Sequence, residues 1–128
     1  MQPNKRSRKR ARQADEEEEA RHRFRYASLA GDVLRKISLE ELGLSIVDVE
    51  ILPDLTGDPK GMCGYLIFAS RAEVRGAQKP GATKSIEAKV RSALANAEFP
   101  SSAIASFEVR TTSLPDIEKR GGRFNFFR

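Results

Sequence analysis

Two strand-forming segments separated by a turn-rich stretch most restrict how this chain of 128 residues can fold. The first lies at 45–52 and reads SIVDVEIL, with alternating apolar and acidic residues that are typical of a strand with one face in solvent. The second lies at 62–70, reads MCGYLIFAS and is apolar on both faces, which favours a central strand. The stretch between them, PDLTGDPKG, is rich in turn-forming residues. Consecutive strands joined in this way favour an antiparallel hairpin.

Two amphipathic segments predict helices on either side of this hairpin. Apolar residues recur at steps of three and four between Tyr26 and Ile37. Asp15 has the character of an N-cap and is followed by acidic residues that suit a helix start, so we expect a helix over roughly 15–37. After the hairpin, Thr83 or Ser85 can cap a second helix that ends before Pro100.

The C-terminal third predicts two more strands. Alternation in AIASFEVRTT at 103–112 indicates a third strand, and RFNFF at 123–127 can form a fourth after the turn SLPDIEKRGG. The expected class is α+β, with elements in the order α-β-β-α-β-β. We expect a four-stranded, mostly antiparallel sheet covered on one face by two helices. Residues 14–128 would form this single domain, and residues 1–13 a disordered basic arm.

Type II KH domains also begin with helix, strand, strand and helix. Their phosphate-binding loop requires Gly-X-X-Gly between two helices. The stretches GAQKPG and PGATK both miss that spacing. The likeness is therefore one of element order alone, and the sequence identifies no family.

The net charge of +5 is concentrated at the two ends of the chain. Residues 1–25 carry a surplus of four positive charges and residues 79–128 another surplus of four, whereas residues 26–78 carry a deficit of three. The single cysteine, Cys63, excludes an intramolecular disulfide and suggests a reducing compartment. No apolar run reaches the length of a membrane helix. We therefore expect a cytoplasmic protein, or a nuclear one in a eukaryote, that does not engage a membrane.

No complete catalytic set is present in the sequence. His22 has no second ligand for a metal nearby, and Cys63 lies in an apolar strand without a histidine partner. Asp48 and Glu50 share a strand face about 7 Å apart and could hold Mg²⁺ with help from Asp54 or Asp58, but strand alternation alone produces such a pair. We therefore expect no enzyme activity, no cofactor, no metal and no small-molecule substrate.

The basic ends carry the candidate contacts with nucleic acid. The arm places six positive charges within eight residues, which can neutralise phosphates. Two lysines lie within the glycine-containing connector GAQKPGATKS, and the C-terminus combines arginines with phenylalanines, as single-strand-binding surfaces do. Among those phenylalanines, Phe124 and Phe126 favour the core and Phe127 the exposed face. The predicted contact residues are Lys5, Arg6, Arg8, Lys9, Arg10, Arg12, Lys79, Lys84, Arg120, Arg123, Phe127 and Arg128.

The sequence thus favours a small, non-enzymatic binding protein that acts in a nucleic-acid or ribonucleoprotein assembly. In this interpretation the arm contacts the phosphates of DNA or RNA. The alternative is a protein-interaction module, such as an inhibitor or regulatory subunit. Such a module would bind its protein partner through the acidic region 40–58 and a sheet edge.

Overall fold

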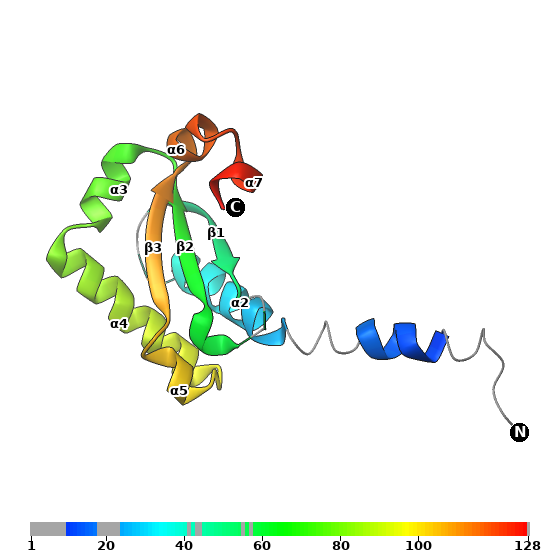
Figure 1. Ribbon diagram of the computed structural model, residues 1–128. Coiled ribbons are helices and arrows are strands. Elements are labelled where there is room, and N and C mark those ends of the chain that lie inside the picture. The colour runs from blue at the N-terminus through cyan, green and yellow to red at the C-terminus, as the bar shows by residue number, and fades with distance from the viewer. Residues whose placement is uncertain are drawn as a thin grey trace, which may run out of the picture.

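A computed structural model describes residues 10–17, 24–40, 42, 45–54, 56 and 58–127. The fold is α+β, as expected, and is built on a three-stranded mixed sheet (Figure 1). The strands are β1 (Ile46–Leu52), β2 (Cys63–Phe68) and β3 (Glu108–Ser113), which lie side by side in that order. The central position of β2 explains why its sequence is apolar on both faces.

The hairpin is confirmed, but the sheet is not mostly antiparallel. Strands β1 and β2 pair antiparallel, with Val49 opposite Leu66 and a register shift between Ile46 and Asp48. Strands β2 and β3 pair parallel, with Leu66 opposite Thr111. The chain between β2 and β3 crosses from one end of the sheet to the other through three helices, and such a crossover returns a strand in the parallel direction.

The predicted fourth strand is wrong, because Arg123–Phe126 forms the short helix α7. Two consecutive glycines, Gly121 and Gly122, precede it with φ of 91° and 99° and turn the chain sharply. The rings of Phe126 and Phe127 both contact Tyr65, with centroids 5.8 and 5.1 Å away. In a strand, consecutive side chains point to opposite faces of the sheet. A helical turn, in contrast, allows the rings of Phe126 and Phe127 to contact the same side chain, that of Tyr65.

Helix α2 (Arg25–Glu40) packs against β1 and β2, and helix α4 (Pro80–Asn96) packs against α2 (Figure 1). Their buried residues include Leu34 and Val90, which join Val49, Leu66 and Phe68 of the sheet in one apolar core. Of the helix predicted over 15–37, residues 15–17 belong to a helical segment at 10–17 with exposed side chains, and residues 25–37 belong to α2. Residues 18–23 lie outside the described part.

The connectors hold more helix than the sequence predicted. The crossover contains α3 (Arg71–Ala77), capped by Ser70, and α5 (Ser101–Ile104). Helix α4 begins at Pro80, before the predicted caps, since proline suits a first helical position. The predicted turn after β3 contains α6 (Leu114–Lys119), and a short 3₁₀ helix, η1 (Pro59–Gly61), lies in the hairpin loop.

Candidate nucleic-acid interface

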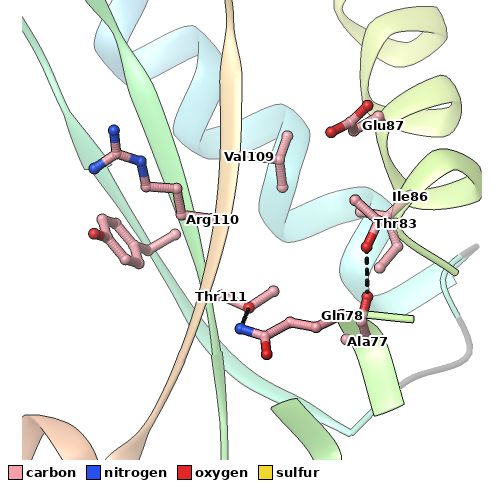
Figure 2. A pocket seen from close by; sticks show the side chains of 9 residues that line it. Ala77, Gln78, Thr83, Ile86, Glu87, Val109, Arg110 and Thr111 are labelled. Carbon is pink, nitrogen blue, oxygen red and sulfur yellow. Dashed lines mark hydrogen bonds between the residues drawn. The ribbon is translucent and has the colours of Figure 1, made fainter. Parts of the chain in front are cut away.

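A groove lies along β3, between that strand and the helices of the crossover (Figure 2). Its volume is about 360 Å³. The helical wall comes from the end of α3, the α3–α4 turn and the first turns of α4, and the other wall from β3. The lining residues are Tyr65, Ala77, Gln78, Thr83, Ile86, Glu87, Val109, Arg110 and Thr111.

Two hydrogen bonds fix the mouth of this groove. Gln78 donates from Nε2 to Thr111 Oγ1 at 3.2 Å, and thereby ties the α3–α4 turn to β3. Thr83 donates from Oγ1 to the Ala77 carbonyl at 3.1 Å, and thereby ties the start of α4 to the end of α3 (Figure 2). Buried Ile86 and half-buried Val109 give the groove an apolar floor beneath these polar groups.

The free edge of β3 lines the groove with main-chain groups. Val49 of β1 donates its N–H to Asp48 Oδ1 at 2.8 Å, and its carbonyl accepts from Arg123 at 3.4 Å. The N–H and the carbonyl of Val49 therefore both point away from β2. In such an antiparallel pair, the N–H and carbonyl of the partner Leu66 point away from β1, and so toward β3. In the parallel ladder Leu66 bonds to the neighbours of Thr111. It follows that Thr111 and Val109 direct N–H and C=O outward, into the groove.

Two exposed lysines are chain neighbours of residues that line the groove. Lys79 and Lys84 each follow a groove-lining residue directly in the chain, and both are exposed. The turn between α3 and α4 is Gln78-Lys79, which follows Gly76 and Ala77 at the end of α3. Lys79 therefore occupies the position at which Gly-X-X-Gly would have its second glycine. Acidic Glu87 of α4 also lines the groove.

Arg110 lies on the opposite face of β3 from Val109 and Ile86 (Figure 2). It donates to Glu108 from Nε at 3.1 Å and from Nη2 at 2.7 Å. Hydrogen bonds with Tyr65 and then Glu108 raise the pKa of Arg110 and keep its guanidinium charged. Sequence reasoning missed Arg110, Gln78 and Tyr65, because only the crossover brings them together. Arg110 carried one signal, its place on the polar side of the strand alternation.

Arg123 binds acidic side chains of the protein itself. Its Nη1 donates to Asp48 Oδ2 at 2.6 Å, and its Nη2 donates to Glu50. Both acids lie on the sheet face away from α2, and the Arg123 guanidinium lowers the pKa of Asp48. The two carboxylates considered for Mg²⁺ therefore hold an arginine. In the described part of the chain, no three potential metal ligands cluster.

The other C-terminal candidates are placed differently from expectation. Phe127 is half-buried against Tyr65, and Phe124, expected in the core, is 81% exposed. Arg120 is exposed and lines a second recess with Lys119 and Phe126.

The remaining candidates lie in the arm or at the chain end. Arg10 and Arg12 belong to the exposed helical segment 10–17, which differs from the expected disorder at residues 10–13. Four arm residues and the last residue lie outside the described residues. These are Lys5, Arg6, Arg8, Lys9 and Arg128.

Cys63 is half-buried on β2, and burial raises the pKa of its thiol, which keeps it protonated at neutral pH. A half-buried, protonated thiol of this kind packs as a small apolar side chain.

Comparisons with protein-family models, curated proteins and solved structures found no match. None of the helices in the described ranges is long and apolar enough to cross a membrane. The chemistry of the groove is therefore the basis for a functional proposal.

Proposed function

We propose that the protein is a small, non-enzymatic binding protein that holds single-stranded nucleic acid in the groove along β3. The observation that supports this most is the composition of that groove. An apolar floor of Ile86 and Val109 lies beside a strand edge with outward N–H and C=O groups. The exposed Lys79 and Lys84 directly follow the groove-lining Gln78 and Thr83 in the chain. Unstacked bases need an apolar or aromatic surface and polar edge partners, and phosphates need nearby cations.

The dimensions of the groove favour a single strand over a duplex. A pocket of about 360 Å³ accommodates one or two small planar groups, whereas a duplex would require a longer, convex basic surface. The arm adds six charges that need no fixed geometry to neutralise phosphates. The groove would thus supply the specific contacts and the arm most of the salt-dependent affinity. We place this activity inside the cell, in a nucleic-acid or ribonucleoprotein assembly.

A direct titration tests the proposal. Fluorescence anisotropy with labelled RNA and DNA 12-mers, single-stranded and duplex, should show tighter binding of the single strands. Binding should weaken steeply as the salt concentration rises. Deletion of residues 1–13 should lower the affinity at low salt and leave the preference for single strands intact, because that preference belongs to the groove. Equal binding of duplex and single strand would contradict the groove as the binding site.

The alternative, a protein-interaction module that uses the acidic region and a sheet edge, has less support. Asp48 and Glu50 already bind Arg123, and the main-chain groups of Val49 at the β1 edge are engaged. A protein partner that co-purifies with the full chain after nuclease treatment would favour this alternative.

A further inference from the structure

The chain after α6 folds back over the open face of the sheet and the edge of β1. The turn that starts it contains Gly121 and Gly122, whose φ of 91° and 99° are readily adopted only by glycine. Beyond this turn, α7 has four residues. An isolated helix of that length is unstable in water, so α7 depends on its contacts with the sheet.

The contacts of this segment with the sheet include an ion-pair cluster and an aromatic cluster, and both are close to solvent. Arg123 binds Asp48, Glu50 and the Val49 carbonyl, and the side chains of Arg123 and Asp48 remain 44% and 42% exposed. The rings of Phe126 and Phe127 lie edge-on to Tyr65, and all three side chains are half-buried. Few apolar contacts and exposed hydrogen bonds are characteristic of segments that open without global unfolding.

We propose that residues 121–127 form a C-terminal strap that opens as a unit about Gly121 and Gly122, with Arg123 controlling the closed population. The closed strap covers one face of Tyr65 and engages the outward carbonyl of Val49, so β1 cannot use that group to pair with another strand. The open strap exposes both the ring of Tyr65 and the carbonyl of Val49. Tyr65 also lines the groove along β3, so opening enlarges the surface beside that groove.

Hydrogen exchange of the full chain tests the strap. The amides of Phe126 and Phe127 donate to Gly122 O and Arg123 O at 3.0 Å, bonds that persist only while α7 is docked. Arg123→Ala should raise the exchange rate of these two amides by about three- to tenfold, the factor expected for the loss of exposed ion pairs. Asp48→Asn should raise it less, because the amide oxygen that it introduces still accepts from the Val49 N–H and Glu50 still binds Arg123.

Arg75→Ala is the matched control, since it removes an exposed arginine on α3, outside the strap and the recess beside Phe126, and should leave these rates unchanged. Amides of β2 and of Ile86–Leu94 should exchange at wild-type rates in all three variants. The strap would be refuted by unchanged exchange at Phe126 and Phe127 in Arg123→Ala. It would also be refuted by an equal rise in β2, because opening would then be global. Neither outcome depends on nucleic-acid binding.

Discussion

Gly64 shows how a missing side chain lets a helix reach the sheet. A Cβ at this position would lie 2.6 Å from Leu34 Cδ2 and 3.2 Å from atoms of Ile51 and Phe107. Leu34 is fully buried on α2, so it has little room to move away. The glycine in the apolar run of β2 therefore sets the distance between α2 and the sheet.

Gly64→Ala should lower the free energy of unfolding by about 1–3 kcal/mol, because the added methyl overpacks a filled core. Urea denaturation followed by circular dichroism measures this change. Gly76→Ala is the matched control: its Cβ would meet nothing within 4 Å, and it lies in α3. That variant should gain up to about 1 kcal/mol from helix propensity. Equal stability of Gly64→Ala and wild type would show that α2 approaches the sheet less closely.

Asp48 connects the stability of the strap to pH. The hydrogen bond from Arg123 is the largest cause that lowers the Asp48 pKa, and Val49 and Arg35 also act in that direction, against desolvation. A carboxyl with a lowered folded-state pKa stabilises the fold above its unfolded pKa, here near 3.8, and this contribution disappears as the pH falls through the folded value. The pair is about two-fifths exposed, so its contribution is small.

Asp48→Asn should therefore cost a few tenths to about 1 kcal/mol at pH 7. The difference from wild type should shrink as the pH falls below about 4 and disappear once the pH is below the lowered pKa of Asp48 in the folded protein. Parallel urea titrations across this pH range measure the difference. A constant gap between the two proteins at all pH values would exclude the charge on Asp48 as its cause.

Helix α6 has a helix-start signal in its sequence, although the segment was predicted to be a turn. Its sequence, SLPDIEK, begins with Ser113 as N-cap, places a proline in the first turn and has Asp116 three residues after the cap. The Ser113 hydroxyl accepts from the Asp116 N–H at 3.3 Å and donates to Asp116 Oδ2 at 3.0 Å. Arg71 of α3 also donates to Asp116, at 2.8 Å, so this cap joins two helices.

Ser113→Ala should destabilise the protein by about 1–2 kcal/mol, because it leaves the start of α6 uncapped at a fully buried position. Thermal unfolding should show a fall of several degrees in Tm for a domain of this size. Ser85→Ala, at an exposed position in α4, provides the control and should change the stability by less than about 0.5 kcal/mol. An effect at Ser113 no larger than at Ser85 would contradict the cap.

The elements that the sequence predicted correctly are those with a local signal. Alternation located β1 and β3, an apolar run bounded by turn residues located β2, and periodicity located most of α2 and α4. The strand predicted at 123–127 failed because two glycines and the Tyr65 contact override the local pattern in RFNFF. The parallel direction of β3 could not be predicted, since it depends on how α3 and α4 cross the sheet.

In the molecule as a whole, the candidate site arises from segments that are far apart in the sequence. Lys79 and Lys84 were predicted contacts and follow groove-lining residues in the chain, but Tyr65, Arg110 and Thr111 join that part of the chain only through the crossover. Arg123 and Phe127 were grouped with them by composition, and the fold uses them in the strap instead. Composition was enough to identify the charged ends of the chain. The groove could not be predicted without the topology, because its walls come from distant parts of the sequence.

The salt dependence of single-strand binding by the Lys79→Ala/Lys84→Ala variant tests the central claim most directly. Each lost phosphate contact lowers the slope of log K against log salt by about 0.7, so the double variant should lose up to about 1.4. Lys36→Ala, an exposed lysine on α2 away from the groove, should retain the wild-type slope. Identical slopes for wild type and the double variant would contradict binding along β3.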